Sequence, residues 1–265
     1  MTINVASFVQ PLSQFAEGFL DQCVTYGAAD IYYSGPPSGK PTGTVQNIQE
    51  MADTWYQKFD GSDASTAGIN LADEHDMLTE LGLTWKDLGT NLAMVIDTIK
   101  SNGVPILLTA PERVLFDVTL GRVPYDWNYA SYNHCIVVCG LYDNGNLMVR
   151  DYANLLAEPG SAREYAASYI AGNIISATAV TPRWKQMEAA IAAMWNAVVD
   201  VPYDTGIALE WAEKTASEDF YGPPLGKELP NTDWNGKPLT AQIFAGGWCE
   251  WQNGKAIWRR YQKGG

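Results

Sequence analysis

The spacing of apolar positions predicts several helices in the first part of the chain. Residues 44–59, 72–83 and 88–103 repeat apolar side chains at helical intervals, as amphipathic helices do. The last two segments end in or near a glycine, the residue type that most often follows a helix. Residues 19–35 are mostly small and apolar and predict a fourth helix that begins near Cys23.

The pattern then changes to short apolar runs, which predict strands. Residues 104–110, 134–143 and 146–153 are runs of this kind, and they are too short for buried helices. The turn-forming sequence DNGN joins the last two runs into an expected hairpin. Helices followed by strands predict an α+β domain over residues 1–182.

The character of the sequence changes after Pro182. Residues 183–199 predict one more helix, and a tail rich in Trp, Gly and Pro follows from about residue 201. We therefore expect a second part, residues 183–265, made of a linking helix and a small module.

The charge of the chain argues against nucleic acid as a partner. Lys and Arg number 17 and Asp and Glu number 30, which gives a formal net charge of -13. An acidic surface of this kind repels nucleic acids and anionic lipids. No apolar stretch approaches the length of a membrane span, and the N-terminal residues lack the pattern of a signal peptide. The sequence leaves the location of the protein open.

Three residues occur in an order that fits the catalytic site of a cysteine hydrolase. A thiol nucleophile needs a base that takes its proton and a group that orients the base. Cys23 stands where a helix is expected to begin, and the unpaired N–H groups there favour a thiolate. His134 opens one predicted strand and Asp151 closes the next, so a hairpin would bring them together.

Each of these residues also has a purely structural interpretation. A cysteine in an apolar segment is often a core residue, and a histidine at a strand end is often a surface group. Asp143, which we interpret as a turn residue, is the alternative carboxylate. The residues Tyr125, Trp127 and Tyr129 precede His134 and would either line a substrate cleft or cover the core.

The sequence predicts no metal site and no other cofactor. Four cysteines occur, and none of their spacings matches a paired zinc-ligand motif: Cys23, Cys135, Cys139 and Cys249. His75 lies among acidic residues of a predicted helix, where we expect a solvated face. No second histidine lies within ligand spacing of it.

An N-terminal cysteine is followed, much later, by NGVPILLTA and then by NHCIVVCGLYDNGNLMVRDYA. In this order residues 8–160 resemble the papain-like C39 family of cysteine peptidases and their C39-like relatives. The resemblance implies a papain-like fold with N-terminal helices packed on an antiparallel sheet. It also implies Cys23 as the nucleophile, His134 as the base and Asp151 as the orienting carboxylate.

Two positions depart from the pattern of that family. The family has a glutamine about six residues before the cysteine to stabilise the oxyanion, whereas this chain has Glu17 near that place. Gln22 or Gln14 would take that role instead, with the backbone N–H of Cys23 as a second donor. The glycine that follows the family's cysteine is replaced by Val24.

The tail contains G-P-P-L-G-x-E, then Q-x-F-x-G-G and then W-x-x-G-x-A-x-W. This layout resembles a single LGFP-type repeat, a module found on proteins that act at bacterial cell walls. Its tryptophans would either stack on sugar faces or form the core of the module: Trp234, Trp248, Trp251 and Trp258.

Together these resemblances imply a cysteine-dependent hydrolase that cleaves an amide bond in a peptide or in a peptidoglycan stem peptide. A phage lysin or a secreted wall enzyme would combine such a body with such a tail and would act outside the cell or at the wall. One alternative is a catalytically degenerate C39-like protein with a binding or structural role in a virion or at a cell surface, which the Glu17 departure favours. The other is acyl transfer to an amine instead of water, as in transglutaminase-like enzymes.

Overall fold

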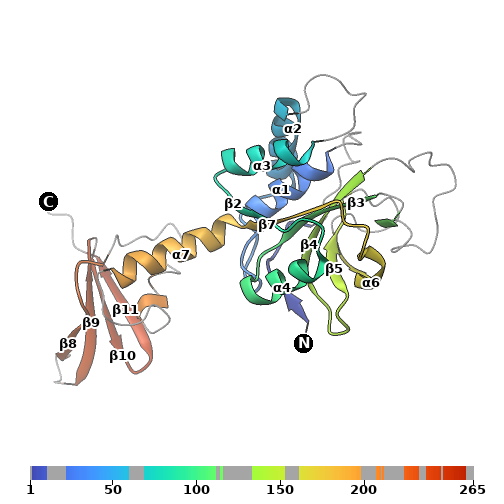
Figure 1. Ribbon diagram of the computed structural model, residues 1–265. Coiled ribbons are helices and arrows are strands. Elements are labelled where there is room, and N and C mark those ends of the chain that lie inside the picture. The colour runs from blue at the N-terminus through green and yellow to red at the C-terminus, as the bar shows by residue number, and fades with distance from the viewer. Residues whose placement is uncertain are drawn as a thin grey trace. The chain divides into compact units, whose positions relative to one another are not determined.

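The computed structural model of the chain describes residues 2–10, 22–59, 69–111, 114–115, 133–152, 161–197, 207–209, 211, 224–232, 237–245 and 247–260. The chain divides into two compact units, Met1–Lys185 and Gln186–Gly265. Helix α7 (Arg183–Asn196) contains the point of division, which lies just after the predicted boundary at residue 182 (Figure 1).

The first unit is an α+β structure built on an antiparallel sheet (Figure 1). Within the described residues the strand order is β2-β7-β3-β4-β5-β6, and β1 pairs with β4 beyond that path. The strands are β1 (Ile3–Asn4), β2 (Thr84–Asp87), β3 (Ile106–Pro111), β4 (Asn133–Leu141), β5 (Leu147–Arg150), β6 (Ala162–Tyr165) and β7 (Ser176–Thr181). The helices are α1 (Cys23–Tyr33), α2 (Val45–Phe59), α3 (Leu71–Glu80), α4 (Leu92–Asn102) and α6 (Ala167–Ile170).

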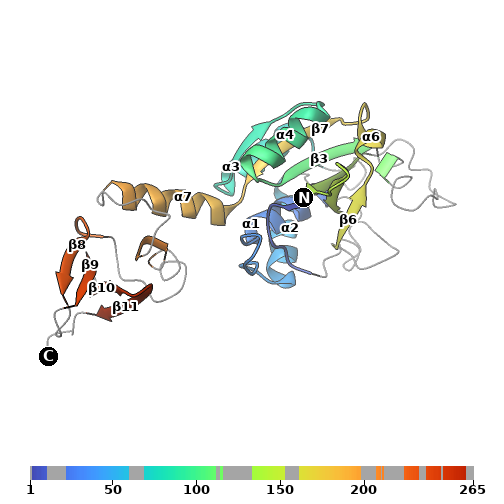
Figure 2. The same cartoon turned by 90° about the horizontal axis from the view of Figure 1, so that it is seen from below.

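Helices cover both faces of this sheet (Figure 2). Along β4, Cys135 and Val137 belong to a core shared with α1, α2 and α3, whereas Ile136 and Val138 belong to a core shared with α4 and α6. This alternation follows from the period of two along a strand. The predicted strands are apolar throughout because both of their faces are buried.

Helix α1 packs unusually close to the sheet because its inward face carries small residues. A Cβ atom added at Gly27 would lie 2.8 Å from Leu107 Cδ2 and 3.1 Å from Val137 Cγ2. Ala28 and Ala29 follow and are fully or almost fully buried. Close packing of this helix brings Cys23, its first residue, against β4.

The second unit contains a four-stranded antiparallel sheet in the order β11-β10-β9-β8. Its strands are β8 (Leu229–Thr232), β9 (Pro238–Phe244), β10 (Gly247–Gln252) and β11 (Lys255–Arg260). Asn253 and Gly254 both have positive φ, 54° and 74°, and form the two-residue turn between β10 and β11. The sequence pattern did not predict these strands individually.

Aromatic side chains form the core of the second unit. The rings of Trp195, Trp211 and Phe244 lie 5.5 to 6.2 Å from one another. Trp251 and Trp258 pack against this cluster. These two tryptophans therefore belong to the core of the module, which is one of the two alternatives that the sequence left open. Trp234 lies outside the described residues.

No helix in the described ranges has the length and apolar character needed to cross a membrane.

Candidate functional site

Cys23 begins α1 and is almost completely buried, with 9% of its surface exposed. Its sulfur accepts a hydrogen bond from the backbone N–H of Cys135 in β4, with N and Sγ 3.3 Å apart. The sulfur therefore lies at the first turn of a helix and in front of a backbone donor of the sheet.

His134 and Asp151 meet across the hairpin formed by β4 and β5. His134 Nε2 lies 2.8 Å from Asp151 Oδ1, and both side chains are buried. The strands run antiparallel, so the start of β4 and the residue after β5 lie at the same end of the hairpin. A hydrogen bond also joins the imidazole to Cys23. Because Asp151 occupies Nε2, Nδ1 is the nitrogen available to the sulfur.

The second carboxylate oxygen of Asp151 is also occupied. The hydroxyl of Tyr165, in β6, donates to Asp151 Oδ2 over 2.9 Å. Tyr165 is fully buried. The sequence analysis did not find this residue, since nothing in the segment Ala162–Tyr165 marks it as more than a core aromatic. The described arrangement is a chain of four side chains, from Cys23 through His134 and Asp151 to Tyr165.

The surroundings of His134 favour its protonated form. Burial opposes a charged imidazolium, but the charge and hydrogen bond of Asp151 and the contact with Cys23 together raise the pKa of His134 well above its ordinary value. A cationic His134 between a carboxylate and a sulfur is the state that an imidazolium–thiolate pair requires.

A buried ionic network holds the backbone on either side of Asp151. Arg150 Nε donates to Asp30 Oδ2 over 3.0 Å, and the Tyr152 hydroxyl donates to the same oxygen over 2.9 Å. Arg150 Nη2 also donates to the carbonyl of Val9 over 2.6 Å. Burial raises the pKa of Asp30, although the charge of Arg150 and these hydrogen bonds oppose the rise. The network ties the chain around Asp151 to α1 and to the N-terminal segment.

Gln22 is the one oxyanion candidate that the described residues include. It directly precedes Cys23, is 1% exposed, and its Oε1 atom is buried without a hydrogen-bond partner. The second oxyanion candidate, Gln14, lies outside the described residues. So does Glu17, which stands near the place of the family's glutamine. The three aromatic residues expected to line a substrate cleft also lie outside them: Tyr125, Trp127 and Tyr129.

The alternative carboxylate does not approach the site. Asp143 lies in the turn that joins β4 to β5, at the opposite end of the hairpin from Asp151, and accepts a hydrogen bond from the hydroxyl of Thr2. The prediction that Asp143 is a turn residue agrees with this position.

His75 was expected on a solvated helix face, and that expectation is wrong. Its ring is partly buried and stacks on Trp85 with the centroids 3.8 Å apart. Its Nε2 atom lies 3.2 Å from Thr178 Oγ1. Burial lowers the pKa of His75, although the nearby carboxylates of Asp87 and Asp76 oppose the shift. The acidic residues around His75 suggested a solvated face, and nothing in the sequence pattern indicated that Trp85 of β2 would stack on its ring.

Metal ligands do not gather anywhere in the part of the chain that the structure describes. All four cysteines are buried, and none of them forms a disulfide. The sequence matches no known family model and no curated protein. The geometry of Cys23, His134 and Asp151 therefore carries the functional argument.

Proposed function

We propose that the first unit is a papain-like, C39-like cysteine hydrolase that cleaves an amide bond in a peptide or a peptidoglycan stem peptide. The observation that carries the proposal is the buried contact series from Cys23 to His134 and Asp151. A helix-start cysteine, a strand histidine and an orienting carboxylate are the parts that thiol-based acyl transfer needs.

In the proposed mechanism, the Cys23 thiolate attacks the carbonyl carbon of the scissile amide. The backbone N–H of Cys23 and the side chain of Gln22 are the donors that we assign to the resulting oxyanion. His134 gives its proton to the leaving amine, which leaves a thioester on Cys23. His134 then takes a proton from water, and the hydroxide releases the acyl group. Asp151 keeps the imidazole in one orientation and stabilises its positive charge.

For the second unit we propose attachment to cell-wall glycan, as the resemblance to an LGFP-type repeat implies. The aromatic core accounts for Trp251 and Trp258, so the proposal rests on Trp248. Trp248 is half-buried, and its Nε1 donates to Glu250 Oε1 over 3.0 Å. Glu250 in turn accepts from Arg259 Nε over 3.2 Å. An indole beside polar side chains is suited to a sugar face.

The proposal is tested by incubating purified cell-wall material and a mixed peptide library with the wild type, Cys23→Ala and His134→Ala. Cleavage should fall at least about a thousandfold in both variants. The control is Cys139→Ala, which removes a buried thiol from the same sheet without touching the triad, and it should cleave normally. Analysis of products with and without an added amine separates hydrolysis from acyl transfer.

Cleavage that survives in Cys23→Ala would overturn the proposal. Tight binding to walls without cleavage by any of the proteins would favour the degenerate binding protein instead.

A further inference from the structure

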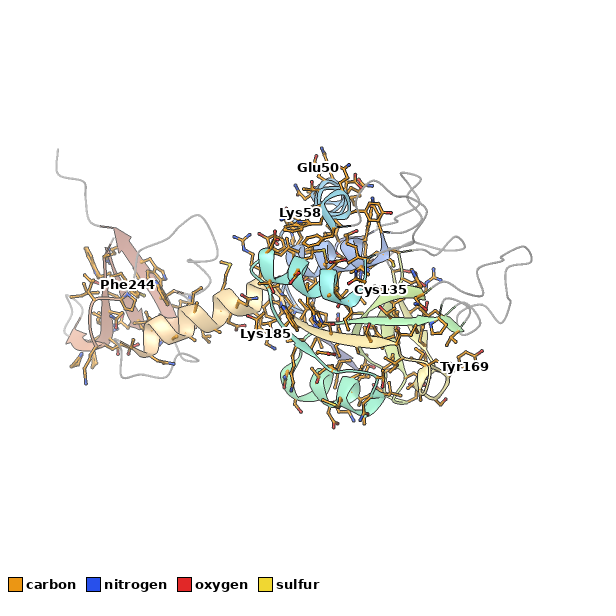
Figure 3. All side chains as sticks on the ribbon, turned by 45° about the horizontal axis from the view of Figure 1, so that its top comes forward. Glu50, Lys58, Cys135, Tyr169, Lys185 and Phe244 are labelled. Atoms are coloured by element: carbon orange, nitrogen blue, oxygen red, sulfur yellow. The ribbon has the colours of Figure 1, made fainter. Side chains whose placement is uncertain are left out.

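A second thiol lies next to the proposed nucleophile. Cys135 follows His134 directly, and its side chain lies in the same core as Cys23, between the sheet and the helices (Figure 3). Its backbone N–H is the donor 3.3 Å from Cys23 Sγ. Within one cysteine, Sγ lies no more than about 4 Å from the backbone N. The two sulfurs therefore lie within about 7 Å of each other, on one side of the sheet.

The two thiols also influence each other electrostatically. Burial, followed by the negative charges of Cys23 and Glu74, raises the pKa of Cys135 well above its ordinary value. Its surroundings thus hold Cys135 as a neutral thiol. If Cys23 becomes a neutral oxidised species, the repulsion that it exerts on Cys135 disappears.

We propose that Cys135 is a resolving cysteine, which forms a reversible disulfide with Cys23 after a peroxide has oxidised Cys23. The inference rests on the proposed nucleophilic character of Cys23. In the first step the Cys23 thiolate attacks one oxygen of hydrogen peroxide and the O–O bond breaks. The other oxygen leaves with the electron pair as hydroxide, which takes up a proton to become water, and Cys23 becomes a sulfenic acid. In the second step the Cys135 sulfur attacks the Cys23 sulfur, and the sulfenic oxygen leaves as water with the Cys135 proton.

The disulfide would stop catalysis and protect the nucleophile at once. The sulfur of Cys23 is the attacking atom of the proposed hydrolysis, so a disulfide between Cys23 and Cys135 removes the activity. The same bond prevents further oxidation to the sulfinic acid, which does not return to the thiol without a dedicated repair enzyme. A dithiol reductant reverses the disulfide by exchange and supplies the two electrons.

Cys139 provides an internal comparison. It lies on the same strand and in the same core as Cys135, but it stands four residues further along, roughly 13 Å away in an extended strand. Its thiol lies 3.4 Å from the carbonyl oxygen of Met148, on the hairpin partner. Cys139 is buried and outside any disulfide, as Cys135 is. It lies too far from Cys23 to form a disulfide with it.

The test is to treat the full-length protein with a small excess of hydrogen peroxide, block remaining thiols with iodoacetamide and map the cysteines by mass spectrometry. The expected result is a peptide containing Cys23 linked to a peptide containing Cys135, with the link lost after dithiothreitol. In Cys135→Ser, Cys23 should accumulate at least about tenfold more sulfinic acid than in the wild type. Cys139→Ser should behave as the wild type does.

Equal sulfinic acid formation in the wild type and Cys135→Ser, or a disulfide from Cys23 to another cysteine, would overturn the inference. The wild-type map needs no variant, so it decides the matter even if Cys135→Ser fails to fold. Because the readout needs no substrate, a Cys23–Cys135 disulfide without hydrolysis would contradict only the proposed function. Hydrolysis without the disulfide would contradict only this inference.

Discussion

At the scale of single residues, the candidate site depends on how completely Asp151 is occupied. Oδ1 contacts His134 Nε2 at 2.8 Å, and Oδ2 accepts the hydroxyl of Tyr165 at 2.9 Å. A buried carboxylate gives up its hydrogen bonds to water, so hydrogen-bond donors of the protein have to replace them. In the proposed mechanism Tyr165 is therefore a positioning residue that acts on the imidazole through Asp151.

Replacing Tyr165 by phenylalanine should weaken both the fold and the proposed activity. The change removes the hydrogen bond from the Tyr165 hydroxyl to Asp151 Oδ2, so the free energy of unfolding should fall by about 1 to 3 kcal/mol. We expect kcat to fall about tenfold with KM little changed, because the imidazole is less well held. Urea denaturation and steady-state kinetics measure the two effects. Tyr169→Phe, at an exposed tyrosine, is the control. A normal kcat in Tyr165→Phe would contradict the positioning role.

Glu74 predicts a pH dependence of stability. Burial, together with the charge of Asp87, raises its pKa from 4.5 to about 7, against a hydrogen bond with Thr178. The folded state therefore holds the proton more tightly than the unfolded state does. The stability linked to this proton is fully present below pH 4.5 and is lost as the pH rises to about 7.

The variant Glu74→Gln should remove this pH-dependent loss. Relative to the wild type, it should be more stable by up to about 3 kcal/mol above pH 7, and the difference should vanish near pH 4. Urea denaturation across this range measures the difference. Glu50→Gln, which makes the same change at an exposed position on α2, is the matched control. A Glu74→Gln variant that is less stable than the wild type at all pH values would contradict the account.

The order and spacing of residues singled out Cys23, His134 and Asp151, which the structure brings together, but not the residues that support them. Cys23, His134 and Asp151 were found because a helix start and a hairpin fix their places locally. Tyr165 and Asp30 reach the site only through the pairing of β5 with β6 and the packing of α1 on the sheet. Contacts of that kind join segments far apart in the sequence, and no local pattern reports them.

At the scale of elements, helix α1 determines where Cys23, the proposed nucleophile, lies. The helix lies so close to the sheet at Gly27 that a Cβ atom added there would be 2.8 Å from Leu107 Cδ2. The strands of the sheet that meet α1 are the ones that the apolar runs predicted, β3 and β4. The polar or small-residue strands β2, β6 and β7 were not predicted, because short strands of this composition lack an apolar pattern.

The variant Gly27→Ala tests this packing. Alanine usually stabilises a helix by up to about 1 kcal/mol relative to glycine. Here the added methyl group would overlap Leu107, so we expect a net loss of about 1 to 3 kcal/mol. Urea denaturation measures the change, and Leu107→Val in the same chain should recover part of the loss by making room. An increase in stability for Gly27→Ala alone would show that α1 does not lie so close to the sheet.

At the scale of the whole molecule, the chain has two units with separate cores. The first is formed around the seven-stranded sheet, and the second around Trp195, Trp211 and Phe244. Trp195 belongs to α7, so a cut after Lys185 leaves both cores intact. The boundary could be anticipated from the change in composition, whereas the sheet of the second unit could not, because its tryptophans and glycines obscure the strand pattern.

Separating the two units should separate the two proposed activities. Residues 1–185 should cleave a soluble peptide as fast as the full chain does, and residues 186–265 should sediment with purified cell walls. Within the second fragment, Trp248→Ala should reduce wall binding about tenfold or more, whereas Arg163→Ala in the first unit should leave wall binding of the full chain unchanged. Wall binding by residues 1–185 alone would contradict this division of roles.

The most direct test of the central claim is the rate at which iodoacetamide alkylates each cysteine at about pH 6, where ordinary thiols react slowly. The account predicts that Cys23 reacts first, and that His134→Ala slows it about tenfold or more. Asp143→Asn, in the same hairpin, should leave that rate unchanged. Equal rates for Cys23 in the wild type and His134→Ala, or faster labelling of Cys135 or Cys139, would contradict the claim that His134 activates Cys23.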